Sequence, residues 1–237
     1  MAINVNEVYT TVLSILNKEQ RGYITPYEFN KLASQVQLEV FDTYFENLTQ
    51  QLRIGGNSSE YADRVKLLQE KIANFETEQV LNVSANGNTI LPSNIYRFGN
   101  LRYKNYNYNP VIIEEVTKKE FNLLTRSSLT KPTDKWPIFY RELIQATISP
   151  VMPSDSNNFY FIDYVFVPDD PIWGFTEGSV GQYLYDPTTS NNFDIDITDK
   201  TEVILRILAY AGVIIRDPQI VQTASQAVMQ QDQLEAS

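Results

Sequence analysis

The sequence contains no histidine and no cysteine, and this double absence excludes more functions than any other feature of its composition. Without these residues the chain has no Ser–His–Asp or Cys–His catalytic set, no thiolate or imidazole ligand for a metal or haem, and no disulfide. Only carboxylates, lysines, tyrosines and hydroxyl groups remain for chemistry, and most reactions that use them need a carboxylate pair or a Mg²⁺ site. We therefore expect a protein that is not an enzyme and that binds no cofactor.

Long apolar runs are also absent. No stretch of 18 apolar residues occurs among the 237, so no membrane span is predicted. The first ten residues, MAINVNEVYT, lack the basic and apolar regions of a secretion signal. With 43% hydrophobic residues and a mean hydropathy of -0.29, the chain is expected to be globular, with one core or a core divided into two lobes.

Positive charge is missing from one long segment. Residues 142–199 contain ten acidic side chains and no Lys or Arg, whereas residues 97–141 contain 9 basic and 4 acidic side chains. In a chain of net charge -10, this asymmetry predicts two surfaces of opposite sign. If the positive surface of one subunit meets the acidic surface of the next, the contact is heterologous and closes a ring when the rotation allows.

The segment from Thr25 to Arg53 is predicted to be the longest helix. Thr25 is an N-cap residue, Pro26 suits the first helical position, and Glu28 completes a capping box with Thr25. At 1.5 Å per residue the helix reaches about 40 Å and needs partners along its length. Its apolar residues follow helical spacing: Phe29, Leu32, Val36, Val40, Phe41, Tyr44, Phe45, Leu48 and Leu52. Shorter helices are predicted before it, to about Asn17, and after it, to about Glu76.

The middle of the chain follows a period of two. Val80–Ala85 and Asn88–Leu91 flank Asn86-Gly87, which predicts a β-hairpin. Phe159–Val167 is apolar on both faces apart from Asp163, so we expect a central strand there. Thr117–Glu120 forms a second capping box and predicts a short helical insert.

Helical spacing returns after Asp199 and leads into a weakly charged, Gln-rich helix from Gln219 to about Leu234. This last helix is either a frayed tail or a segment that docks onto a partner. The order of elements predicts an α+β fold in which the N- and C-terminal segments form a long-helix bundle with an inserted small β-sandwich or barrel. The expected divisions are 1–78 for the N-terminal helices, 79–197 for the sandwich and its short helix, and 198–237 for the C-terminal helices.

No motif in the sequence predicts a metal or nucleotide site. A Ca²⁺ loop is suggested by the spacing of Asp194, Asp196 and Asp199. It is excluded because the required Gly and the final acidic ligand are missing. A turn followed by a helix cap explains these aspartates better, and Pro168–Pro171 is predicted to be a rigid turn. The glycines at 174, 178 and 181 match neither a P-loop nor a dinucleotide fingerprint.

The basic stretch 97–141 leaves three readings open. Its cations alternate with aromatic residues, a pattern that can bind single-stranded nucleic acid through phosphate pairing and base stacking. It is equally consistent with a solvated sheet face or with a contact between subunits. A carboxylate-only hydrolase acting on cell-wall glycans is a further alternative, although no pattern places two carboxylates together.

Several segments resemble small virion proteins of tailed phages, especially the crAss-like phages. The resemblance is carried by NKEQRGYITPYEFNKLASQVQLEVFDTYF (Asn17–Phe45), KPTDKWPIFYRE (Lys131–Glu142), ATISP (Ala146–Pro150), DYVFVPDDPIW (Asp163–Trp173) and the helix-rich segment after Asp199. Together they cover nearly the whole chain, through loose motifs without catalytic residues. The family is that of head–tail connector proteins, also called adaptor or ring proteins.

This resemblance implies a homo-oligomeric ring, usually of twelve copies, between the portal protein and the tail in the neck of the virion, assembled in the host bacterial cytoplasm. The ring would surround passing genomic DNA without sequence-specific contact. We expect two partner-binding regions. Trp173 and Phe175, on a Pro-rich loop, would meet another ring, and the last helix would meet a neighbouring subunit or the portal through Gln222, Gln226, Gln230 and Leu234.

Overall fold

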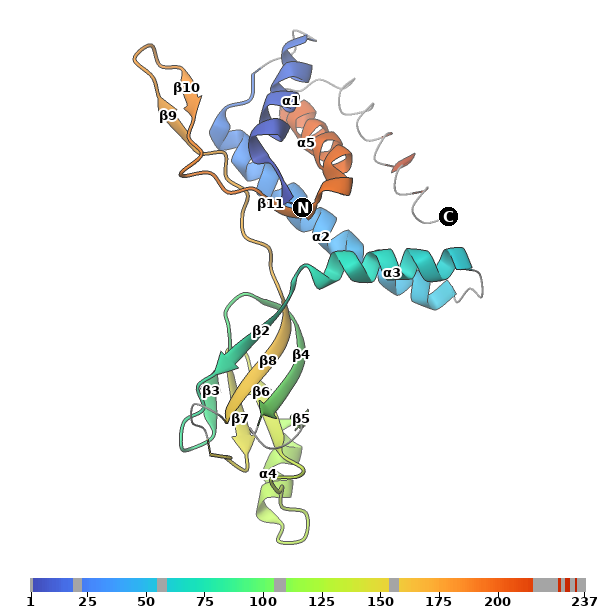
Figure 1. Ribbon diagram of the computed structural model, residues 1–237, viewed down its shortest axis with the longest axis vertical. Coiled ribbons are helices and arrows are strands. Elements are labelled where there is room, and N and C mark those ends of the chain that lie inside the picture. The colour runs from blue at the N-terminus through green and yellow to red at the C-terminus, as the bar shows by residue number, and fades with distance from the viewer. Residues whose placement is uncertain are drawn as a thin grey trace. The chain divides into compact units, whose positions relative to one another are not determined.

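The computed structural model describes residues 2–18, 23–54, 59–104, 110–153, 158–214, 226, 229, 230 and 233 (Figure 1). The chain forms two compact units. Unit 1 comprises residues 1–74 and 168–237, and unit 2 comprises residues 75–167. Unit 2 is therefore a continuous segment inserted into unit 1.

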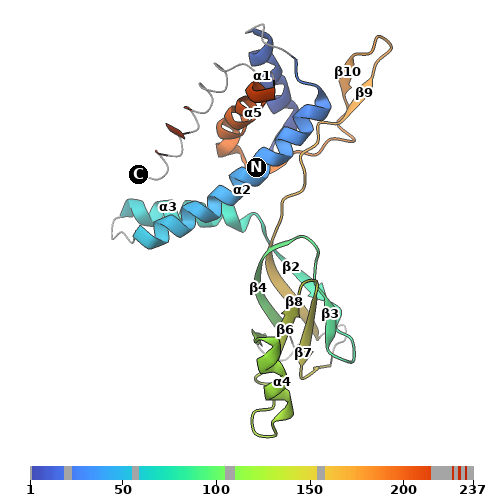
Figure 2. The same cartoon turned by 180° about the vertical axis from the view of Figure 1, so that it is seen from behind.

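Unit 1 is built on helices α1 (Val5–Lys18), α2 (Pro26–Ile54), α3 (Ser59–Ala73) and α5 (Lys200–Ile214). Helix α2 packs against α3 and α5, and α1 packs against α5 (Figures 1 and 2). Their facing side chains form an apolar core that is closed to solvent and includes Phe29, Val36, Val40, Phe41, Val203 and Ile207. The helical spacing of these residues in the sequence places them on one side of each helix.

The predicted start of α2 is confirmed. The Thr25 N–H donates to Glu28 Oε2 at 2.9 Å, and the Glu28 N–H donates to Thr25 Oγ1 at 3.3 Å. Hydrogen bonding to Thr25 lowers the pKa of the Glu28 carboxyl below its ordinary value. The second capping box is confirmed too, because Thr117 and Glu120 make the same reciprocal contacts at the start of α4 (Lys118–Arg126).

Unit 1 also contains two short antiparallel strand pairs. Strand β1 (Ala2–Ile3) pairs with β11 (Phe193–Asp196), which leads into a 3₁₀ turn, η1 (Ile197–Asp199). Strands β9 (Phe175–Glu177) and β10 (Tyr183–Tyr185) form a hairpin with register Tyr183↔Glu177 and Tyr185↔Phe175. Both views show this hairpin extending beyond the helices of its own unit (Figures 1 and 2).

Unit 2 is one curled mixed sheet of seven strands in the order β2-β8-β4-β5-β6-β7-β3 (Figure 1). Neighbours are antiparallel except β5 and β6, which are parallel and are joined through α4. The core of the sheet includes Leu101, Ile113, Ile148, Tyr160 and Ile162. The strands are β2 (Glu76–Leu81), β3 (Asn88–Ile90), β4 (Ile95–Lys104), β5 (Val111–Glu115), β6 (Ile138–Glu142), β7 (Gln145–Ser149) and β8 (Phe159–Phe166).

The expected long-helix bundle with an inserted β-sandwich or barrel is wrong. The class is α+β, but the β part is a single curled mixed sheet, and most of the described helices are short. Helices α1, α3, α4 and α5 span 9 to 15 residues, and α2 spans 29. Alternating apolar residues indicate which side of a strand is buried, but they do not indicate which strands pair, and pairing decides between one curled sheet and two stacked ones.

The hairpin predicted around Asn86-Gly87 forms only its turn. Gly87 adopts φ 83° and its N–H donates to the Ser84 carbonyl at 2.8 Å. Strand β2, however, pairs with β8, and β3 pairs with β7, so these two strands are the opposite edges of the sheet. The Gly87 carbonyl accepts from the Ile148 N–H at 2.9 Å, which aligns β3 with β7 instead. The interior position expected for β8 is confirmed, since it lies between β2 and β4.

Candidate interaction surfaces

Trp173 is the centre of an aromatic cluster at the base of the β9–β10 hairpin. Its ring is 4.3 Å from that of Tyr9, 5.7 Å from that of Tyr185 and 6.0 Å from that of Phe175. Its indole Nε1–H donates to Asn6 Oδ1 at 3.0 Å. The cluster therefore joins the hairpin to α1. Burial raises the pKa of the Tyr9 phenol above its ordinary value, so this ring stays neutral.

The backbone of Trp173 makes a second connection, to α2. Its N–H donates to Asn30 Oδ1 at 2.8 Å, and its carbonyl accepts from Asn30 Nδ2 at 3.3 Å. One asparagine side chain thus satisfies both backbone groups of a residue 143 positions away. The base of the hairpin is held firmly by these contacts.

The predicted partner-binding residues occupy different environments. Trp173 is only 4% exposed and is engaged inside unit 1, and Phe175 is half-buried. Gln226 and Gln230 are exposed and helical, whereas Gln222 and Leu234 lie outside the described residues. Their contact with partners stays a prediction.

The exposed apolar side chains in and beside the hairpin were not predicted from the sequence. Val180, at its tip, is 86% exposed, and Leu184 and Ile172 are exposed as well. The signal was available in Gly178-Ser-Val-Gly181, because a turn between two aromatic strands leaves its central residues without neighbours. We call residues 168–191 the arm. It contains four acidic residues and no basic one: Asp169, Asp170, Glu177 and Asp186.

The other acidic residues of this region are structural. A turn with a cap forms here, but the capping residue is Asp196, which accepts from the Thr198 N–H at 3.0 Å at the start of η1. The Asp199 carboxylate accepts instead from the Lys71 ammonium and the Tyr44 hydroxyl. Asp194 accepts from the Asp169 N–H at 3.0 Å, and burial raises the pKa of its carboxyl. The turn predicted at Pro168–Pro171 is not found, because these residues form neither a turn nor a bend. The segment is instead held by Gln37, whose Nε2–H donates to the Asp169 carbonyl at 2.7 Å. Within the described ranges, no three acidic side chains gather into a possible metal site.

A second exposed surface lies on unit 2, over α4 and the loop that follows it. We call residues 117–137 the α4 patch. Three of its large apolar side chains are exposed, Leu123 at 61%, Trp136 at 71% and Leu129 at 93%. The patch contains five basic residues, Lys118, Lys119, Arg126, Lys131 and Lys135, against two acidic ones.

Part of the basic stretch 97–141 is neutralised by acidic residues of the same unit. Arg102 pairs with Glu78 at 3.1 Å and with Asp163, and Arg141 pairs with Glu115 at 3.4 Å. Unit 2 as a whole carries nine basic and nine acidic side chains, while unit 1 carries 10 basic and 20 acidic ones. The entire net charge of -10 therefore belongs to unit 1.

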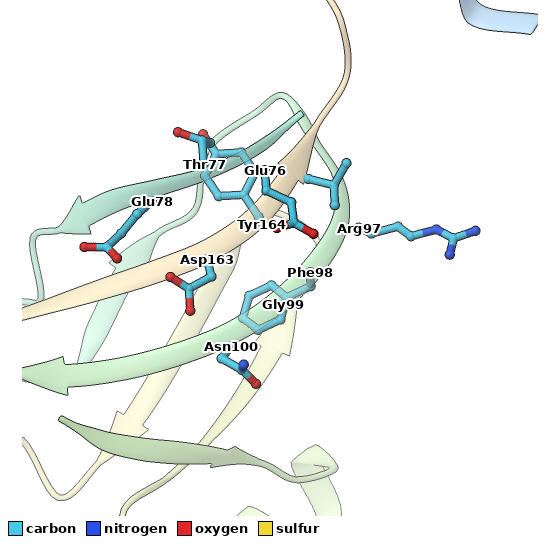
Figure 3. Close-up of a pocket in the computed structure, with 10 residues that line it drawn as sticks. Glu76, Thr77, Glu78, Arg97, Phe98, Gly99, Asn100, Asp163 and Tyr164 are labelled. Carbon is cyan, nitrogen blue, oxygen red and sulfur yellow. The ribbon is translucent and has the colours of Figure 1, made fainter. Parts of the chain in front are cut away.

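A hollow of about 480 Å³ lies on the outer face of β2, β8 and β4 (Figure 3). It is lined by Glu76, Glu78 and Asp163, with Arg97 pointing away from these carboxylates (Figure 3). Gly99 allows β4 to approach β8, because a Cβ there would be 2.6 Å from the Asp163 carbonyl oxygen. Since Arg102 already pairs with two of the carboxylates, the hollow is better explained as an ion-paired sheet surface than as a catalytic cleft.

Comparison with known proteins gives no family: no family model and no curated protein matches the chain. None of the helices that the structure describes is long and apolar enough to cross a membrane.

Proposed function

We propose that this chain is a structural protein of a tailed-phage virion that forms the head–tail connector ring between portal and tail. One observation carries the proposal: the net charge of -10 is confined to unit 1, while each unit exposes large apolar side chains. Exposed apolar residues on both units suit a subunit that is covered on several sides. The resemblance of Asn17–Phe45 and Asp163–Trp173 to connector proteins supports the same function.

The charge distribution suits a protein beside a DNA channel. Genomic DNA carries a dense negative charge, and a surface with acidic excess repels phosphates instead of binding them. If unit 1 lines the channel, DNA passes without sequence-specific contact. Unit 2, with equal numbers of acidic and basic residues, has no net charge that would oppose contact with neighbouring proteins.

The proposed ring contains twelve copies and contacts the portal on one side and an adjacent ring or tail protein on the other. The exposed helical residues Gln226 and Gln230 lie on a weakly charged segment suited to a protein contact. The protein performs no chemistry in this proposal, so its mechanism is packing and geometry.

Nucleic-acid binding through residues 97–141 is the less supported function. Arg102 and Arg141 are engaged by carboxylates, and Lys118 pairs with Glu142. Phosphate binding would first have to break these pairs. A filter-binding assay across salt concentrations separates the two functions, because phosphate contacts give a steep loss of affinity with salt.

Electron microscopy of necks isolated from virions, with the chain carrying a small tag, tests the proposal. We expect tag density repeated around the axis in one layer adjoining the portal. Tag density in the capsid shell or the tail tip, or a virion free of the chain, would overturn it.

A further inference from the structure

We propose that the arm of one copy docks onto the α4 patch of a second copy, and that this contact joins neighbouring subunits. The inference rests on the proposed ring and names the surfaces that build it. The arm is the β9–β10 hairpin with its flanking segments, and the patch is α4 with its following loop (Figure 1).

The arm combines exposed apolar side chains with a base that is anchored to the helices of unit 1. Its tip presents Val180, which is 86% exposed, and Leu184 extends the apolar surface along β10. Its base does not swing freely, because Trp173 bonds to Asn6 on α1 and to Asn30 on α2. A rigid arm loses little conformational freedom on binding, so its apolar contacts contribute more to affinity.

Contacts with the neighbouring sheet and at the helix start hold the α4 patch in place. Helix α4 is fixed at its start by the Thr117–Glu120 capping box, and Phe121 packs edge-on against Tyr140 of β6 at 4.8 Å. These contacts turn Leu123 outward, while the loop exposes Leu129 and Trp136. Exposed Trp and Leu beside cations form the kind of surface that becomes the centre of an interface.

Charge selects the arm as the occupant of the patch. The patch has a net charge of +3, and the arm has four acidic residues and no basic one. Lys119, Arg126 and Lys131 have no side-chain partner among the described residues, so their charges are available to a second molecule. Two patches repel each other and so do two arms, which leaves arm on patch as the favourable pairing.

This pairing has the symmetry that a ring needs. Each copy offers one arm and one patch, and different surfaces meet at every contact. A heterologous contact of this kind repeats from copy to copy until the rotation closes it. A two-fold dimer could also pair each arm with the patch of the other copy, so the size of the assembly distinguishes a ring from a dimer.

Charge reversal tests the pairing. The variant Lys119→Glu/Arg126→Glu reverses the patch, and Asp170→Lys/Glu177→Lys reverses the arm. We expect each variant alone to weaken self-association at least tenfold, and the four substitutions combined to restore it. The matched control, Lys31→Glu/Lys66→Glu, changes the net charge as much as the patch variant, at exposed positions of α2 and α3, and should assemble like the wild type.

A disulfide test reports the contact directly, because the chain has no cysteine of its own. Val180→Cys and Leu129→Cys proteins are prepared separately and mixed under mild oxidation. We expect a disulfide-linked dimer in the mixture and none from either protein alone.

The outcomes separate this inference from the proposed function. If the wild type forms rings while the reversed variants assemble normally and the mixed cysteines stay unlinked, the arm–patch contact is wrong and the ring remains. If the wild type stays monomeric with and without portal protein, the ring proposal fails and the contact fails with it.

Discussion

Lys71 and Asp199 form a buried ion pair although 128 residues separate them in sequence. Lys71 Nζ lies 2.7 Å from Asp199 Oδ1, and the two side chains are 14% and 6% exposed. Asp199 also accepts a hydrogen bond from the Tyr44 hydroxyl. Burial raises the pKa of the Tyr44 phenol, and the negative charge of Asp199 raises it further. The pair joins α3 to η1, which directly precedes α5, and the hydrogen bond from Tyr44 adds α2.

Removing one partner of this pair should destabilise the protein strongly. Asp199→Ala leaves the Lys71 ammonium buried without its counter-charge, which costs about 3 kcal/mol of unfolding free energy. Urea denaturation followed by circular dichroism measures the loss. The matched control is Lys66→Ala on α3, the helix that carries Lys71. Lys66 pairs with Glu70 at 3.8 Å, and both side chains are exposed. This substitution should cost less than about 0.5 kcal/mol, since exposed pairs contribute little. Equal losses at the two sites would contradict the structural role of Asp199.

Asp194 and Asp196, two residues apart, should respond to pH with opposite signs. Burial raises the folded-state pKa of Asp194, so stability falls as pH rises from the ordinary aspartate value of 3.8 through the raised one. The Thr198 N–H lowers the folded-state pKa of Asp196, so its contribution is present above 3.8 and is lost as pH falls through the lowered value.

Two asparagine variants check these signs at pH 7. Asp194→Asn should raise the unfolding free energy and Asp196→Asn should lower it, because the first removes a disfavoured charge and the second a favoured one. Each difference should shrink as the pH is lowered below 4. Denaturant unfolding at both pH values gives the comparison, and two shifts of the same sign at pH 7 would rule out the assignment.

Leu143 lies in the turn between β6 and β7 with a backbone conformation that is unfavourable for leucine. It begins the two-residue connection between β6 and β7, where Glu142 pairs with Gln145, and it adopts φ 27° while 98% exposed. Glycine adopts positive φ without strain, and the leucine side chain makes little contact that could be lost. Leu143→Gly should therefore stabilise unit 2 by about 0.5–1 kcal/mol, measured by thermal unfolding. Leu143→Ala keeps the strained backbone and should give no gain, so an equal gain from alanine would refute the strain argument.

Unit 2 should fold when it is separated from the rest of the chain. It is continuous, its core is its own, and its ends are held together where the Phe166 N–H donates to the Phe75 carbonyl at 2.9 Å. A fragment of residues 75–167 should show cooperative unfolding and dispersed amide signals in an NMR spectrum. A fragment of residues 79–167, which removes half of the edge strand β2, is the control and should unfold more easily. Random-coil signals from the longer fragment would contradict the independence of the unit.

The features predictable from the sequence were local ones. The capping boxes of Thr25 and Thr117 depend on residues three positions apart, and the buried face of α2 depends on spacing within one helix. The arrangement of the sheet depends on partners far along the chain, such as Gly87 with Ile148. Nothing local to Asn86-Gly87 indicates that its two strands lie at opposite edges.

The candidate surfaces also depend on contacts between residues that are far apart in the sequence. Trp173 looked like a surface residue because it stands on a Pro-rich loop, but Asn6 and Asn30 bury it from segments more than 140 residues away. Likewise, the basic stretch 97–141 was expected to form one positive surface, but Arg102 pairs with Glu78 and Asp163, and most of the positive charge without carboxylate partners among the described residues belongs to the α4 patch. Charge counted along a sequence does not show which charges are paired in space.

Native mass spectrometry of the purified chain, alone and with portal protein, tests whether the chain forms a ring. We expect an assembly of twelve chains, roughly 330 kDa for a subunit of 27.3 kDa, either alone or bound to portal. A single species at 27.3 kDa under both conditions would contradict it.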